Sequence, residues 1–306
     1  MVGGRRVGMG VCADESVVSV HWASCGVGVC AEDVIVDGGR LGGEQPVDLA
    51  GDGINGGGDR MLGAAKQLIG AVVDLLYPRN CQFCRQPLAE QERGVICSTC
   101  LEQVKWIKPP CCQRCALPFV GAVSDTFECG YCKDLKLHFQ RGVAACLATG
   151  IVLESIHHFK YHRRMYFGWH LADWMITAGR ERVDWARVDA VVPVPLHPRK
   201  KREREFNQAE YLAEAVGKTF QRPVWNRVLR RVRDTPTQTH LDALQRRENL
   251  RGAFALRKTA VVRGKRLLLV DDVFTTGATL DACATVLTRA GATEVTVLTV
   301  ARGAYV

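Results

Sequence analysis

The stretch Lys265–Leu280 reads KRLLLVDDVFTTGATL. Its apolar run, Leu267–Val270, has the uninterrupted pattern of a strand that is buried on both faces of a parallel sheet. Two adjacent carboxylates, Asp271 and Asp272, stand at the carboxyl end of this run, where open α/β sheets place their ligands. The stretch therefore predicts a buried strand that carries two acidic side chains to the edge of a ligand-binding loop.

A short polar loop follows and opens a helix that continues through Val286 and Leu287. Backbone N–H groups at a helix N-terminus attract anions, a glycine lets the backbone approach closely, and hydroxyls add donors. Carboxylates do not bind a phosphate, so the aspartates indicate a ligand with hydroxyls or a metal beside its phosphate, as in ribose 5-phosphate. The alternative is an exposed turn with helix-capping threonines, which leaves the paired carboxylates unexplained. We expect the anion cradle to consist of Thr275, Thr276, Gly277, Ala278 and Thr279.

Three other segments have strand patterns, namely Gly142–Leu147, Val188–Val194 and Glu294–Val300. The last two are apolar, and loops and helical patterns alternate with these strands along the chain. This alternation is typical of an α/β fold in which helices flank a parallel sheet.

Eight cysteines form two sets, each with two C-x2-C pairs: Cys81, Cys84, Cys97 and Cys100, then Cys112, Cys115, Cys129 and Cys132. Four thiolates presented by two turns match a tetrahedral Zn2+ site, and a site closed by four protein ligands is structural rather than catalytic. The alternative is disulfides or buried apolar thiols, and Cys111 offers a substitute for its neighbour Cys112. We therefore expect two structural Zn2+ sites in a double zinc ribbon.

The remaining composition narrows the class of protein. A formal net charge of +9 suits an anionic partner, which is a phosphorylated small molecule, a nucleic acid or an acidic protein face. No uninterrupted apolar run is long enough for a membrane span, and Arg5 and Arg6 lack the apolar stretch of an export signal behind them. We expect a cytoplasmic protein in a reducing compartment.

The chain divides into three parts by composition. Residues 1–60 hold half of the 30 glycines and show no sustained periodicity, so they are either a flexible tail or the product of a mis-assigned start, with the initiator at Met61. Residues 61–140 should contain a helix, from Leu62 to the stop at Pro78, and then the double zinc ribbon. Residues 141–306 should form the α/β domain.

The Asp271–Thr279 motif closely resembles that of the type I phosphoribosyltransferases, in which a hydrophobic strand, two acidic residues and a T-T-G-x-T-like loop bind phosphoribosyl pyrophosphate. By this resemblance, Asp271 and Asp272 hold the ribose 2- and 3-hydroxyls, and Thr275–Thr279 hold the 5-phosphate. The wider chain resembles the ComF family, double-zinc-ribbon proteins associated with competence and DNA uptake. Beyond the two modules in this order, the similarity is carried by Phe159-Lys160-Tyr161, Pro193-Val194-Pro195, Phe206–Glu210, Thr235–Gln238, Arg247 and Asn249.

A basic loop after the second strand carries Arg199, Lys200, Lys201, Arg202 and Arg204. By the resemblance it is the pyrophosphate loop, and Arg204 is the expected ligand contact and catalytic partner of Asp271 and Asp272. The family usually has glycine where this chain has Glu205, a position where positive φ or a close backbone approach would need one. The stretch Arg230–Phe254 is by the same resemblance the flexible loop that closes over the substrate.

Two functions fit these patterns. The first is transfer of phosphoribose from phosphoribosyl pyrophosphate to a nitrogen nucleophile, with Mg2+ and release of pyrophosphate. Purine-salvage relatives have an aspartate where this chain has Thr275, which argues against a close copy of that activity. The second is a non-catalytic module that engages single-stranded DNA or a DNA-handling helicase. The sequence does not identify the accepting base. It also leaves the oligomeric state open, including whether the protein forms a homo-oligomer.

Overall fold

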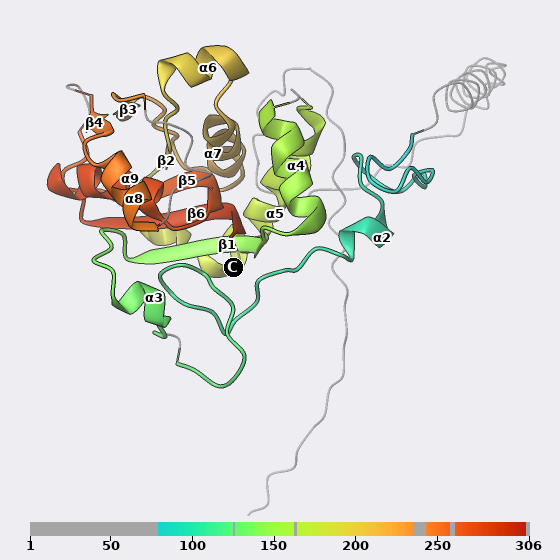
Figure 1. Cartoon of the computed structure of the whole chain (residues 1–306), viewed down its shortest axis with the longest axis horizontal. Helices are drawn as coiled ribbons and strands as arrows, with labels where there is room; N and C mark the ends of the chain where they lie inside the picture. The colour runs from blue at the N-terminus through green and yellow to red at the C-terminus, as the bar shows by residue number, and fades with distance from the viewer. Residues whose placement is uncertain (1–78, 125, 162–163, 235–242, 258–260, 304–306) are drawn as a thin grey trace, which may run out of the picture. The chain divides into compact units, whose positions relative to one another are not determined.

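The computed structural model describes residues 79–124, 126–161, 164–234, 243–257 and 261–303 (Figure 1). The expected tail over residues 1–60 and the expected helix before Pro78 lie outside the described residues, as does the Thr235–Gln238 motif. Within the described ranges, no helix is long and apolar enough to cross a membrane.

A four-stranded parallel sheet is the centre of the α/β domain. Its strands are β1 (Arg141–Leu147), β2 (Ala190–Pro193), β5 (Arg266–Phe274) and β6 (Glu294–Arg302), in the order β1-β6-β5-β2. This confirms the predicted parallel sheet. The prediction that the central strand ends at Val270 is wrong, because pairing with β6 continues to Phe274↔Arg302. Asp271 and Asp272 therefore lie within β5 rather than after it.

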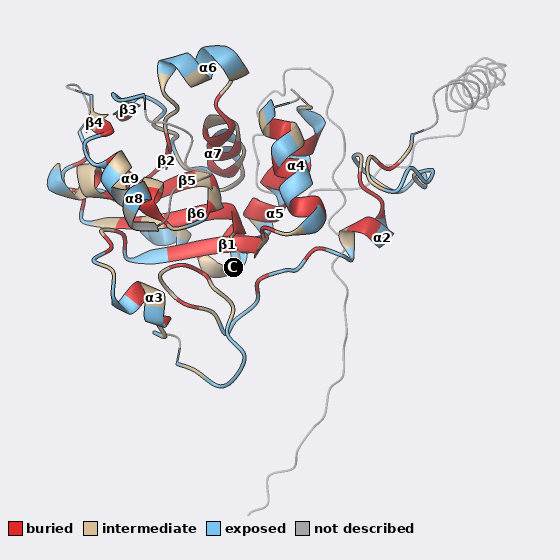
Figure 2. Cartoon of the chain, in the orientation of Figure 1, coloured by how far each residue is buried: buried red, intermediate tan, exposed pale blue. Residues whose placement is uncertain are grey.

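Helices cover both faces of the sheet, and alternate apolar residues of β5 pack against the helices of one face and then of the other. Leu268 and Val270 share a core with α4 (Gly150–Tyr161), α5 (Tyr166–Arg182) and α7 (Gln208–Thr219). Leu267 and Leu269 share a second core with α8 (Ala243–Leu250) and α9 (Ala278–Arg289). Because side chains alternate between the faces of a strand, a run buried on both sides must be apolar throughout. Figure 2 shows that most of the sheet is buried, with less buried residues towards the strand ends.

Four short elements precede or follow β2. A 3-10 turn, η1 (Trp185–Arg187), precedes β2, and the two-stranded antiparallel sheet of β3 (Leu229–Arg231) and β4 (Phe254–Leu256) brackets α8. The basic segment expected as a loop is instead a helix, α6 (Pro198–Arg204), begun by proline at its first position and by the His197 cap. Glu205 ends it in the left-handed conformation, with φ 66°, which is the backbone geometry that glycine would adopt most easily.

The two cysteine-rich segments each share a core with a different face of the sheet. Cys81, Cys97 and Cys100 belong to the core of α4, α5 and α7, whereas Cys112, Cys115, Cys129 and Cys132 belong to that of α8 and α9. Each segment has one short helix, α2 (Ser98–Leu101) or α3 (Gly130–Lys133), which begins directly after the third cysteine of its set. The segment between the sets runs beside β1, where the Ile107 N–H donates to the Ala145 carbonyl over 2.9 Å.

Gly94 allows the first cysteine-rich segment to dock on α5. The Val95 N–H donates to Nε2 of the buried His170 over 3.1 Å, and burial lowers the pKa of His170 to about 4, so the ring is neutral and can accept this bond. Gly94 has φ 87°, and a Cβ there would overlap the His170 ring. The close approach and the left-handed backbone both require glycine.

Gly94→Ala should therefore lower the melting temperature of the zinc-loaded protein by several degrees. The left-handed conformation alone costs a non-glycine residue roughly 1–2 kcal/mol, and the overlap with His170 adds to that cost. Gly130→Ala is the matched control, because a Cβ at Gly130 meets no heavy atom within 4 Å. Equal melting temperatures for the two variants in a thermal unfolding scan would contradict this account of the docking.

Candidate functional site

The two aspartates are adjacent in β5, and their side chains interact with each other. Asp272 is 3% exposed and forms an ion pair with Lys160 of α4. Its Oδ1 accepts the Val273 N–H over 2.9 Å, and the Asp271 Oδ1 accepts the Asp272 N–H over 2.9 Å. The pair is thus fixed by the backbone, and a cation from a helix 112 residues earlier neutralises one member.

The carboxyl group of Asp271 has a raised pKa. Burial and, to a smaller degree, the adjacent charge of Asp272 raise the pKa of Asp271 to about 8, although Lys160 acts in the opposite direction. At neutral pH Asp271 keeps its proton in the unliganded protein, while Asp272 faces the Lys160 ammonium. A ligand that brings hydroxyls or a divalent cation would favour the ionised form of Asp271.

The loop after β5 brings the predicted anion-binding residues together. Thr275 and Thr276 precede Gly277, which is the N-cap of α9 with φ 76°, and Ala278 and Thr279 already lie in the first turn of the helix. A Cβ at Gly277 would lie 2.8 Å from the Phe274 ring, so the tight turn requires glycine. The Ala278 N–H is directed at the Thr276 Oγ1 over 3.4 Å. The loop therefore places a helix N-terminus directly after the acidic pair.

An apolar cleft of about 590 Å3 lies between α4 and the end of β5. The sequence patterns assign no role to His157 and His158, and they indicate Lys160 and Tyr161 only as part of a family resemblance. All four line this cleft together with Val273 and Thr275. Their i, i+3 and i+4 spacing along α4 was the available signal, since such residues share one helix face.

Arg204 lies at the Tyr161 end of α4. Its guanidinium stacks over the Tyr161 ring at 4.7 Å and donates from Nη2 to the Tyr161 hydroxyl over 3.0 Å. Nη1 donates to the Gln208 Oε1 over 3.2 Å, which links the end of α6 to the first turn of α7. Of the basic run, Arg204 is thus held beside a residue that lines the apolar cleft.

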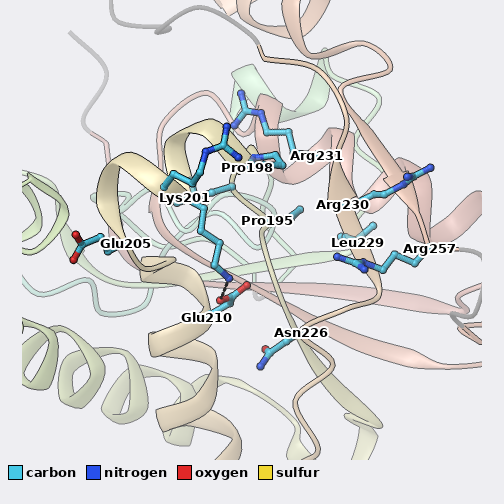
Figure 3. A pocket seen from close by; sticks show the side chains of 12 residues that line it. Pro195, Pro198, Lys201, Glu205, Glu210, Asn226, Leu229, Arg230, Arg231 and Arg257 are labelled. Carbon is cyan, nitrogen blue, oxygen red and sulfur yellow. Dashed lines mark hydrogen bonds and ion pairs between the residues drawn. The ribbon is translucent and has the colours of Figure 1, made fainter.

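The other cations of α6 have a different environment. Lys201 and Arg202 line a separate pocket of about 570 Å3 with Arg230, Arg231 and Arg257 (Figure 3). Lys201 is paired there with Glu210 over 2.7 Å. Arg199 pairs with Glu203 over 3.2 Å on the exposed side of the helix. The structure therefore divides the basic run, which the sequence had presented as one loop, among three surroundings.

The eight paired cysteines form two compact clusters, and the ligand atoms within each lie within 4.8 Å of one another. A tetrahedron of sulfur atoms around Zn2+ at a Zn–S distance of about 2.3 Å has edges of about 3.8 Å. The Sγ atoms of Cys81 and Cys100 are 3.8 Å apart, those of Cys84 and Cys97 3.6 Å, and those of Cys115 and Cys129 3.7 Å. Both clusters therefore have the dimensions of a structural zinc site.

Backbone hydrogen bonds prepare both clusters for a cation. The Cys97 N–H donates to the Cys81 Sγ over 3.4 Å, and the Cys129 N–H donates to the Cys112 Sγ over 3.3 Å. Burial opposes ionisation of Cys81, but N–H donors from Cys97, Cys84 and Phe83 outweigh it and lower the pKa of Cys81 to about 6. Such bonds stabilise a thiolate, which is the form that binds Zn2+.

Two family models match the chain, one for each module. A family model for a double zinc ribbon domain matches residues 72–136, and one for a phosphoribosyl transferase domain matches residues 217–304. Among solved structures, a purine phosphoribosyltransferase from Pyrococcus horikoshii is 17% identical with a TM-score of 0.28, over 42% of this chain and 70% of that one. The allosteric regulatory enzyme of purine biosynthesis is 22% identical with a TM-score of 0.30, over 44% of this chain and 26% of that one.

Two full-length relatives decide the family. The DNA utilization protein YhgH of Salmonella typhimurium is 34% identical over 226 residues, which are 73% of this chain and 96% of that protein. The competence protein F of Haemophilus influenzae is 31% identical over 230 residues, with the same coverage. With a double zinc ribbon ahead of a phosphoribosyltransferase-type domain, the chain belongs to the ComF family.

Proposed function

We propose that the carboxyl end of β5 binds phosphoribosyl pyrophosphate with Mg2+, and that the chain transfers the phosphoribosyl group to a nitrogen nucleophile. The observation that carries this proposal is the position of two carboxyl groups and a helix N-terminus at the end of one strand. The 5-phosphate would accept hydrogen bonds from the loop Thr275–Thr279, and the ribose 2- and 3-hydroxyls would donate to Asp271 and Asp272. A simple phosphate would leave the two aspartates unused, and a simple sugar would leave the anion-binding loop unused.

The surroundings of the acidic pair support a reaction as well as binding. In the transfer, the bond between the anomeric carbon and the pyrophosphate oxygen breaks, a carbon–nitrogen bond forms, and the nucleophile loses a proton. Mg2+ supplies charge neutralisation for the pyrophosphate oxygens when it is bound. Arg204, held beside Tyr161, would add a cationic donor for the leaving group, and the apolar cleft along α4 would take a flat acceptor and exclude water.

A second candidate is a binding module for single-stranded DNA. The pocket lined by Lys201 and Arg202 of α6 favours this candidate, because five cationic side chains and only two carboxylates line the pocket. The relatives' names, which refer to DNA utilization and to competence, agree with such a role. This pocket and the acidic pair are separate features, so one chain can carry both functions. The first candidate is preferred because it explains the paired aspartates, which a cation-lined surface for DNA does not need.

Calorimetric titration of the zinc-loaded protein with phosphoribosyl pyrophosphate and Mg2+ tests the site. We expect saturable binding that Asp271→Asn with Asp272→Asn weakens at least tenfold, since both acceptors for the ribose hydroxyls and the cation are altered. Asp134→Asn is the control, because this exposed carboxylate lies at the end of α3 and should not affect affinity. An unmodified protein that does not bind the ligand would refute the proposal and favour the DNA-binding candidate.

Binding should also release a proton at neutral pH. Asp271 is protonated below its pKa of about 8, and a site that needs its carboxylate must ionise it. The affinity should therefore rise by up to tenfold per pH unit between pH 6 and pH 8 and level off above the pKa. Titrations at pH 7 in buffers of different ionisation enthalpy should report close to one released proton. Proton release that is absent at pH 7, or an affinity that falls as the pH rises, would contradict this assignment of Asp271.

A further inference from the structure

The second cysteine cluster contacts the loop that follows β5. Tyr131 lies in α3, between Cys129 and Cys132, and its hydroxyl donates to the backbone carbonyl of Thr276 over 3.2 Å. The two residues are 145 positions apart in the sequence. A residue that lies between two cysteines of the second cluster therefore holds one peptide group of the anion-binding loop.

Because of the geometry of the peptide bond, this contact also fixes the direction of the Gly277 N–H. The peptide bond is planar and trans, so the carbonyl of Thr276 and the N–H of Gly277 point in opposite directions. When Tyr131 holds the Thr276 carbonyl towards the ribbon, the Gly277 N–H must point away from it. Glycine residues rotate their peptide groups more freely than other residues, so this peptide needs an external constraint.

Arg302 applies the same constraint to the two preceding peptides. It lies at the end of β6, is 1% exposed, and donates from Nη1 to the carbonyls of Phe274 over 3.1 Å and Thr275 over 2.8 Å. Three consecutive carbonyls, of residues 274–276, are thus held by donors from β6 and the ribbon. The described residues offer no backbone acceptor to the N–H groups of Thr275, Thr276 and Gly277, which leaves these donors for a ligand.

Two more contacts join the same ribbon to this region. The His138 backbone N–H donates to the Asp281 Oδ1 over 2.7 Å, and the His138 Nδ1 lies 3.1 Å from the same oxygen. The Phe139 ring meets the Phe274 ring edge to face, with centroids 5.9 Å apart. The ribbon therefore contacts the last residue of β5, the loop and the first turn of α9.

We propose that Tyr131 is a positioning residue of the phosphate site, and that it directs the Gly277 N–H at the ligand's phosphate through the Thr276–Gly277 peptide. The proposal rests on the proposed function, in which the 5-phosphate occupies this loop. The second ribbon is then part of the ligand-binding site, and its folded state and the affinity for a phosphorylated ligand are thermodynamically linked.

The test is Tyr131→Phe, which removes one hydroxyl and keeps the ring. Tyr166→Phe is the matched control, because the Tyr166 hydroxyl donates to Gln82 of the first ribbon over 3.3 Å, away from the loop. In the ligand-free, zinc-loaded protein, the amide resonance of Gly277 should shift in Tyr131→Phe and stay in place in Tyr166→Phe. The affinity for phosphoribosyl pyrophosphate should fall roughly three- to tenfold only in Tyr131→Phe, with zinc content and melting temperature unchanged.

The amide resonance and the affinity together distinguish failure of the positioning role from failure of the proposed function. An unshifted Gly277 resonance together with unchanged affinity in Tyr131→Phe would overturn the positioning role. An unmodified protein that binds neither phosphoribosyl pyrophosphate nor inorganic phosphate would overturn the proposed function and the phosphate contact with it, whereas the resonance would still report whether Tyr131 orients the peptide.

A measurement on the unmodified protein covers the case in which Tyr131→Phe loses zinc. Linkage is reciprocal, so bound phosphoribosyl pyrophosphate with Mg2+ should slow the transfer of one of the two zinc equivalents to a chromogenic chelator. The Asp271→Asn, Asp272→Asn variant controls for chelation by the ligand itself and should show no such protection. Equal release rates with and without bound ligand would refute the coupling.

Discussion

Pairing between β5 and β6 is the constraint on which the rest of the site depends. The ladder continues past the apolar core to Asp271↔Thr299 and Phe274↔Arg302. This extension holds both aspartates in strand geometry, and it brings Arg302 against the carbonyls at the start of the loop. If the strands separated at Val270, the acidic pair would have no fixed direction, and the carbonyls of Phe274 and Thr275 would lose the hydrogen bonds that Arg302 donates to them.

The zinc ribbons extend this arrangement on both faces of the sheet. Cys81, Cys97 and Cys100 of the first set are buried in the core that contains α5, where the neutral His170 ring accepts a hydrogen bond from the Val95 N–H beside Gly94. Those of the second set are buried in the core that contains α9, where Tyr131 and His138 contact the loop and the helix after it. Short segments of this kind have little core of their own, so metal binding supplies much of their folding free energy.

The sequence predicts the features that depend on local pattern. The apolar run Leu267–Val270 indicates a strand buried on both faces, the paired C-x2-C spacings indicate two clusters, and Gly277 marks the tight turn. Contacts between distant elements leave no such pattern. The Lys160–Asp272 ion pair, the Tyr131 bond to the loop and the cleft along α4 all join segments far apart in the chain. The helix α6 was missed because its six charged residues resemble a solvated loop, and only the His197 cap and Pro198 signal its start.

A crystal structure of the zinc-loaded protein with ribose 5-phosphate and Mg2+ tests the proposed site most directly. We expect the phosphate within hydrogen-bonding distance of the Gly277 and Thr276 N–H groups, on the side of the loop opposite Tyr131, and the ribose hydroxyls at Asp271 and Asp272. A ligand seated instead among Lys201, Arg230 and Arg257 would contradict the central claim, because the acidic pair and the loop would then not form the binding site.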